Sequence, residues 1–186
     1  NGHDYRLSIK REAHGRASRL LHDRFESGDV IEVASPAGDF VLDRGTQPIV
    51  MLSGGVGITP MVAMLDGLVS AQRSGAPGRE VYFIHATRNS ASRAFRGELE
   101  ALARQYDWLH LFTAYSAPGA EDSLGHTHDI EVRLSMEVLA DLLPFGGYQF
   151  YLCGPESFMR ALYSGLRDMG IDRSHIHYEF FGAGEL

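Results

Sequence analysis

The chain has 186 residues, of which 44% are hydrophobic, enough for one domain or for a domain and part of another. Its formal net charge of −7 argues against general nucleic-acid binding. A single cysteine, Cys153, excludes an internal disulfide framework and suits a cytoplasmic location. The sequence has no apolar run long enough for a membrane span.

The first part of the chain predicts a small β structure. Alternating and β-branched residues favour strands at 5–10, 30–33 and 40–42. Arg19–Phe25 has the apolar spacing of a helix. Asn1-Gly2 is a typical hairpin turn and needs a strand before it, so we expect an N-terminally truncated chain. Residues 1–45 therefore predict the C-terminal part of a small antiparallel β-barrel.

From Pro48 onward, strands alternate with helices, which predicts an α/β domain with a parallel sheet over residues 46–186. Strands are expected at 48–52, 81–85, 109–114, 149–152 and 175–180. Helices are expected at 59–73, 91–105, 136–143 and 156–169, and a polar surface loop at 116–130. Right-handed crossovers give a doubly wound, five-stranded sheet in the order 3-2-1-4-5.

The stretch PIVMLSGGVGITPM at 48–61 predicts a buried strand, a glycine-rich turn and a helix start. Thr59 suits the N-cap and Pro60 the first helical position. Such a helix N-terminus suits a pyrophosphate. The absence of Gly-Lys-Ser/Thr excludes a P-loop, and Pro60 departs from the common dinucleotide fingerprint. The predicted strand order places Cys153-Gly154-Pro155 opposite this turn, across a crevice at the carboxyl ends of strands one and four.

Seven segments in chain order resemble the FAD- and NAD-binding reductase of flavohaemoproteins and related oxygenase reductases, within the ferredoxin-NADP reductase superfamily. They are YRLSIKRE at 5–12, Gly15-x-x-Ser18, PAGDF at 36–40, SGGVGITPM at 53–61, HATRN at 85–89, YLCGP at 151–155 and YEFFG at 178–182. The resemblance covers essentially the whole chain. The Arg-x-Tyr-Ser strand that grips FAD in that family is missing from this sequence.

The resemblance implies two cofactor sites. For the FAD pyrophosphate it implies Gly15, Arg16, Ala17 and Ser18. For NAD it implies Gly55, Gly57, Ile58, Thr59, Pro60, Cys153, Gly154 and Pro155. It places Glu179 and Phe181 at the flavin ring, and the candidate catalytic residues are Glu179, Cys153 and Thr59. We interpret Cys153 as a polarizable wall of the crevice, because no histidine or acid partner for a nucleophile stands out.

Nucleotide choice is ambiguous in the sequence. An acid about 20 residues past the glycine turn would mark NAD, but Thr87-Arg88-Asn89 stands there and leaves room for a 2′-phosphate near Arg88. The HATRN segment nevertheless resembles reductases that favour NADH. We therefore predict a preference for NADH with some use of NADPH.

The expected function is a diaphorase reaction, in which hydride passes from NADH to FAD and single electrons then pass to a partner. That partner is a haem globin domain or a [2Fe–2S] ferredoxin domain of the same full-length chain. Two alternatives are a non-catalytic nucleotide-binding sensor and a nucleoside- or methyl-donor-binding transferase. No metal site is predicted, because His126-x-His128 and His175-x-His177 lack further ligands at metal spacing. The acidic stretch at 119–131 is interpreted as a solvated face.

Overall fold

The computed structural model describes residues 5–144 and 146–181 of the chain. Its contacts form two compact units, one up to Asp39 and one from Phe40 onward. The described part of the first unit contains one helix, α1 (Arg16–Arg24), which overlaps the helix predicted at 19–25. The second unit contains the sheet and the remaining helices.

The strands predicted before residue 45 are wrong for the described residues, because 5–10, 30–33 and 40–42 belong to no strand. Alternating apolar residues favour an extended backbone, but a strand also needs a hydrogen-bonded neighbour. The part of the chain that the structure describes gives these segments no such neighbour. Leu7 and Val30 are exposed as a result. The predicted barrel is therefore not formed within the described residues.

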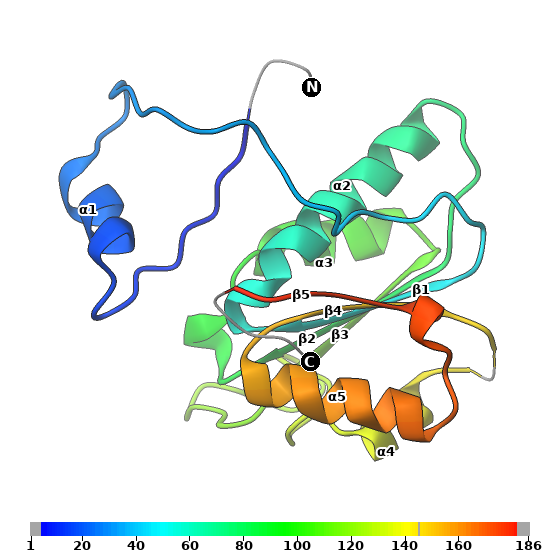
Figure 1. Cartoon of the computed structure of the whole chain (residues 1–186). Coiled ribbons are helices and arrows are strands. Elements are labelled where there is room, and N and C mark those ends of the chain that lie inside the picture. Colours follow the sequence, from blue (N-terminus) through cyan, green and yellow to red (C-terminus); the bar gives the residue numbers. More distant parts are fainter. Residues whose placement is uncertain (1–4, 145, 182–186) are drawn as a thin grey trace. The chain divides into compact units, whose positions relative to one another are not determined.

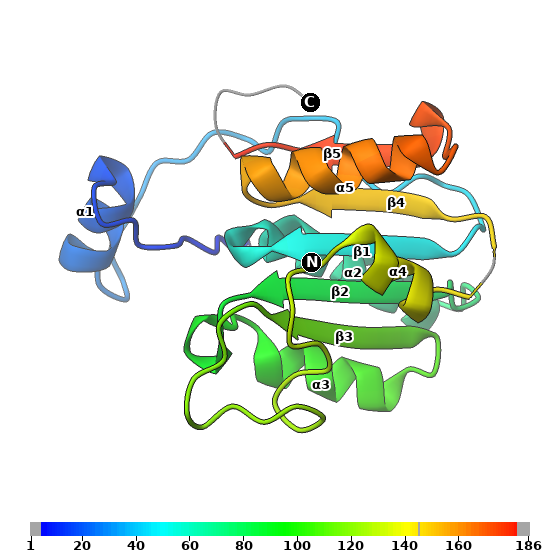
Figure 2. The same cartoon turned by 90° about the horizontal axis from the view of Figure 1, so that it is seen from below.

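The predicted parallel sheet is confirmed, with its strands in the order β3-β2-β1-β4-β5 (Figure 2). Its strands are β1 (Ile49–Gly54), β2 (Val81–Thr87), β3 (Leu109–Tyr115), β4 (Gln149–Cys153) and β5 (Ile176–Glu179). Every neighbouring pair is parallel. All five strands therefore end at one edge of the sheet, where a doubly wound fold binds its ligands.

Helices cover both faces of the sheet (Figure 1). Helices α2 (Ile58–Arg73) and α3 (Arg96–Gln105) lie on one face, and α4 (Met136–Leu142) and α5 (Glu156–Asp168) on the other. In β1, Ile49 and Met51 pack in the core beneath α2, while Val50 and Leu52 pack beneath α5. Burial on both faces explains why β1 is a continuous apolar run. None of the described helices is both long enough and apolar enough to cross a bilayer.

The helix predicted at 91–105 begins later than expected. A short 3-10 turn, η2 (Ser90–Ser92), follows β2, and α3 starts only at Arg96. The break has a local cause: Asn89 and Ser92 form a reciprocal capping box, and Phe95 has a φ of 58°. A left-handed residue cannot continue a right-handed helix, so α3 starts after it.

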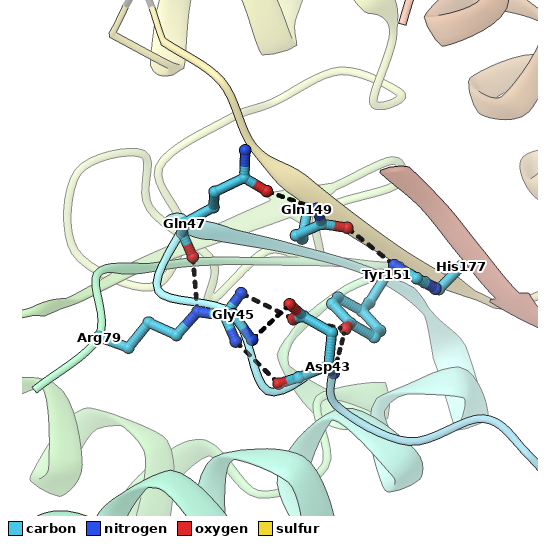
Figure 3. A network of polar contacts seen from close by, with 7 residues as sticks. All are labelled: Asp43, Gly45, Gln47, Arg79, Gln149, Tyr151 and His177. Atoms are coloured by element: carbon cyan, nitrogen blue, oxygen red, sulfur yellow. Dashed lines mark hydrogen bonds and ion pairs between the residues drawn. The ribbon is translucent and has the colours of Figure 1, made fainter. Parts of the chain in front are cut away.

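The segment before β1 is held by hydrogen bonds near the other end of the sheet, where the parallel strands begin (Figure 3). The Asp43 carboxylate accepts a hydrogen bond of 2.7 Å from Arg79 Nη2. The backbone N–H of Asp43 donates to the Tyr151 hydroxyl at 2.8 Å. Burial alone would raise the pKa of Asp43, but the bonds from Arg79 and the Gly45 N–H outweigh it and hold the pKa below its usual value. Asp43 is thus an ionised anchor.

The same network reaches the strands beside it. Gln149 Nε2 donates to Gln47 Oε1 at 2.6 Å, and His177 Nε2 bonds Gln149 Oε1 at 2.9 Å. Phe40 packs against the Tyr151 ring, so residues from 40 onward belong by packing to the sheet unit. The division into domains 1–45 and 46–186 remains a prediction about domain identity.

Candidate functional site

A tight glycine turn leads from β1 into α2. Residues Gly55–Gly57 form the 3-10 turn η1, and α2 follows directly at Ile58. Gly55 has a φ of +53°, and a β-carbon there would meet nothing within 4 Å. This is the position at which the turn requires glycine and its outer side is open.

Thr59 and Pro60 lie two residues further into the helix than predicted. The N-cap of α2 is Gly57, so Thr59 and Pro60 are its second and third residues. The prediction of Thr59 as N-cap was wrong because η1 winds the glycines themselves into the helix start. No side chain caps η1 or α2, and the first turn of α2 has no acid. The positive end of the α2 dipole is therefore left for an anionic ligand.

The two glycine-containing turns are in backbone contact. A β-carbon on Gly57 would lie 2.1 Å from the Cys153 carbonyl oxygen, and one on Gly154 would lie 3.0 Å from the Gly54 nitrogen. The two turns lie opposite each other as predicted, but the predicted crevice does not separate their backbones at Gly57, where they are in contact. Gly57 is therefore required for packing, whereas Gly55 faces open space. Phe158 of α5 lies over both Gly54 and Gly154, a contact that no sequence pattern indicated.

A row of polar side chains crosses the sheet just below these turns. Strand register aligns Thr113, His85, Ser53, Cys153 and Glu179 in order from β3 to β5. The first four are buried, and Glu179 at the end of β5 is partly exposed. Polar residues at the carboxyl end of otherwise apolar strands are a feature of a site rather than of a core.

Burial favours the neutral form of two side chains in this row, Cys153 and His85. It raises the pKa of the Cys153 thiol to about 12, with a contribution from the charge of Glu179. Burial, with the nearby positive charge of Arg93, lowers the pKa of His85 to about 4. Both groups are therefore neutral near pH 7, so Cys153 is not a thiolate nucleophile.

His85 supports the glycine turn from below, a role that sequence reasoning missed. Its Nδ1 lies 2.9 Å from the hydroxyl of Ser53, the residue before Gly54. Its Nε2 is buried and has no hydrogen-bond partner among the described residues. The signal available in the sequence was a histidine at the end of a buried strand, in HATRN at 85–89.

The other predicted NAD residues have distinct environments. The Ile58 side chain is buried in the core, and its N–H bonds within η1. Pro155 is the N-cap of α5, directly after the β4 turn. Arg88 follows β2 and is exposed, and its guanidinium makes no hydrogen bond or ion pair with any described residue. Phe181 is 55% exposed.

The predicted FAD residues lie together in the first unit. Gly15 is the N-cap of α1, and Arg16, Ala17 and Ser18 form its first turn. This helix start has no side-chain cap and no acid, so it also suits a phosphate. The Ser18 hydroxyl already accepts a 3.2 Å hydrogen bond from the Glu12 N–H.

Within the described residues, no group of three histidine, cysteine, aspartate or glutamate side chains could hold a metal ion. The two helix starts and the glycine turns are instead suited to phosphate groups. The arrangement at the carboxyl edge, with an open glycine turn beside a row of polar side chains, fits a dinucleotide.

Known proteins are similar to this chain in sequence. A flavohemoprotein of Bacillus cereus is 41% identical over 184 residues, covering 96% of this chain and 45% of that protein. A flavohemoprotein of Pseudomonas aeruginosa is 43% identical over 183 residues, covering 98% of this chain and 44% of that protein. The chain thus spans less than half the length of these relatives.

Among solved structures, the flavohem-like FAD/NAD binding domain of a nitric oxide dioxygenase from Vibrio cholerae is similar with a TM-score of 0.79 and 32% identity. The match covers 94% of this chain and 70% of that one. A ferredoxin NADP+ reductase from Neisseria gonorrhoeae shares the fold at a TM-score of 0.71 and 20% identity, covering 91% of this chain and 71% of that one. The expected resemblance to the reductase of flavohaemoproteins is confirmed, whereas the likeness to ferredoxin-NADP reductases is one of fold. Residues 51–163 also match the model of the oxidoreductase NAD-binding domain. This chain belongs to the oxidoreductase NAD-binding domain family.

Proposed function

We propose that this chain binds NADH at the carboxyl edge of its sheet and passes hydride to FAD bound through its first unit. The open glycine turn at Gly55, which leads into the uncapped start of α2, is the observation that carries the proposal. The NAD-binding family and the FAD/NAD binding domain from Vibrio cholerae support it.

In this proposal, each turn has one task. The first turn of α2, with Gly55 and Thr59, takes the NADH pyrophosphate. The turn Cys153-Gly154-Pro155 borders the nicotinamide, and the start of α1, Gly15–Ser18, takes the FAD pyrophosphate. Glu179 adjusts polarity beside the reacting atoms, and Phe181 covers the flavin face until the nicotinamide displaces it.

When bound, FAD supplies the acceptor for the hydride, which is two electrons and one proton, and it releases electrons singly. The chain itself must align the reactants and exclude water. Neutral His85 and Cys153 neither give nor take a proton near pH 7, which suits a reaction without acid–base catalysis by the enzyme. Alignment by the two packed glycine turns is then the main contribution of the sheet unit.

We propose a haem domain as the electron acceptor, because the relatives that are 41% and 43% identical are flavohemoproteins. The ferredoxin reductase from a carbazole dioxygenase system is only 20% identical and supports the fold alone. The test first reduces the FAD bound to the chain. It then compares the rate at which a ferric flavohaemoprotein globin domain is reduced with the rate at which a [2Fe–2S] ferredoxin is reduced. Faster reduction of the ferredoxin would contradict this choice of partner.

The central test places a charge at Gly55. Aspartate and asparagine both tolerate a left-handed backbone and have nearly the same size, so Gly55→Asp and Gly55→Asn differ mainly in charge. We expect Gly55→Asp to weaken NAD⁺ binding at least about tenfold relative to Gly55→Asn, because its carboxylate would repel the pyrophosphate. Equal affinities, measured by calorimetry, would show that no phosphate lies there.

Catalysis is tested by mixing the chain with FAD and NADH without oxygen and following flavin absorbance. Bleaching that depends on NADH is the expected result. Nucleotide binding without bleaching, in a sample with bound FAD, would favour the non-catalytic sensor instead.

A further inference from the structure

The carboxyl end of β2 lacks the acid that commonly selects NAD. In dinucleotide-binding sheets that acid bonds the ribose 2′-hydroxyl, whereas an arginine accommodates a 2′-phosphate. Here Thr87 ends β2 and Arg88 follows it. Arg88 is exposed, and none of the described acidic residues forms an ion pair with its guanidinium. Taken alone, this end of β2 would accept a 2′-phosphate.

The loop after β3 folds back onto the same turn. Its Ser116 N–H donates to the Thr87 carbonyl at 3.0 Å, and its Ala117 N–H donates to the Arg88 carbonyl at 2.9 Å. These bonds fix the start of the loop beside the turn that follows β2. The loop can therefore place its own side chains where a residue after β2 would normally act.

Asp122 is the acid that this loop brings to the turn. Its Oδ2 accepts hydrogen bonds from the Gly119 N–H at 2.7 Å and from the Ser90 N–H at 3.4 Å. The second oxygen, Oδ1, is enclosed and has no hydrogen-bond partner among the described residues. The carboxylate therefore joins the loop after β3 to the turn after β2, and it forms no ion pair with any described cation.

Asp122 is ionised at neutral pH. Hydrogen bonds from Ser90 and from the Gly119 N–H lower its pKa below the usual value. The expectation that the acidic stretch at 119–131 is only a solvated face is thus wrong for this residue, which holds two backbone donors. A fixed negative charge stands at the same turn as the exposed Arg88.

We propose that Asp122 determines the preference for NADH over NADPH by repelling a 2′-phosphate at the carboxyl end of β2. This inference rests on the proposed function and deepens it. A 2′-hydroxyl is neutral and is unaffected by that charge, whereas a phosphate monoester carries nearly two negative charges near pH 7. Arg88 then accounts for the residual binding of the phosphorylated nucleotide.

The test measures affinities of the full chain for NAD⁺ and NADP⁺ by calorimetry. Asp122→Asn keeps the size of the side chain and removes its charge. We expect it to tighten NADP⁺ binding about tenfold, while NAD⁺ binding changes less than about twofold. Arg88→Gln should do the opposite and weaken NADP⁺ binding alone.

Glu121→Gln is the matched control, because it removes one negative charge from the exposed residue that directly precedes Asp122. It should leave the ratio of the two affinities unchanged. If Asp122→Asn leaves that ratio unchanged, or if Glu121→Gln changes it equally, the role of Asp122 is overturned while the nucleotide site stands. If neither nucleotide binds the unsubstituted chain, the proposed function fails and the inference fails with it.

Discussion

The carbonyl oxygen of Cys153 lies 2.1 Å from the position that a β-carbon on Gly57 would occupy. Gly57 thus lets the turn after β1 rest directly on the turn after β4. Its role differs from that of Gly55, whose outer side is open. The glycines of one short motif therefore divide into one that permits packing and one that permits a left-handed turn.

Gly57→Ala should destabilise the sheet unit by about 1–3 kcal/mol, because the methyl group must push a backbone carbonyl aside. The measurement is the free energy of unfolding in urea. Gly67→Ala is the control: Gly67 lies within α2, and a β-carbon there meets nothing within 4 Å. It should be neutral or stabilising by up to about 1 kcal/mol. Equal stability of the two variants would contradict the packing role of Gly57.

His85 should make the fold sensitive to acid. Its pKa is about 4 in the folded chain against an ordinary value of 6.5, so the unfolded chain binds the proton more tightly. Its contribution is therefore full above about pH 6.5 and is lost as the pH falls toward 4, amounting to about 3 kcal/mol. His85→Asn should reduce the slope of unfolding free energy against pH in this window. An unchanged slope would mean that His85 is not the titrating group.

Asp43 should anchor the segment before β1. Its removal in Asp43→Ala leaves Arg79, whose side chain is only 9% exposed, without its carboxylate. We expect a loss of about 2 kcal/mol in unfolding free energy near pH 7. Since the folded pKa of Asp43 is lowered, this contribution disappears as the pH falls below about 4.

The control for Asp43 is an exposed ion pair. Glu156 bonds Arg160 at 2.8 Å on the surface of α5. The substitution Glu156→Ala should lower the free energy of unfolding by at most about 1 kcal/mol. A similar cost for the two substitutions would show that the Asp43 network contributes no more than a surface pair.

Cys153 should be chemically inert in the folded chain. Its thiol is buried and has a pKa of about 12, so iodoacetamide should label it near pH 7 only after unfolding. Cys153→Ala should keep NADH-dependent flavin reduction within about tenfold of the unsubstituted rate, because no covalent step uses the sulfur. Rapid labelling of the native chain, or complete loss of flavin reduction in a folded Cys153→Ala variant, would indicate that Cys153 takes part in catalysis.

Local sequence signals determined the sheet unit. Continuous apolar runs such as Ile49–Leu52 predicted strands buried on both faces, and their alternation with helices predicted the parallel order. The apolar runs and the alternation of strands with helices predicted the sheet correctly, because both patterns are set by residues close together in the chain. The same signals failed at 5–10 and 30–33, since alternation indicates an extended backbone but cannot supply a neighbouring strand.

Only the tertiary structure decided how the site is supported. The Ser53–His85 bond joins residues that are 32 positions apart, and the Ser90–Asp122 bond also spans 32 positions. Such pairs depend on which strands become neighbours and on how the loop after β3 returns to the sheet. The sequence by itself determined the fold of the sheet unit and the position of the glycine turn. The burial that neutralises His85 and Cys153, and the loop geometry that brings Asp122 to the end of β2, arise only when the strands assemble.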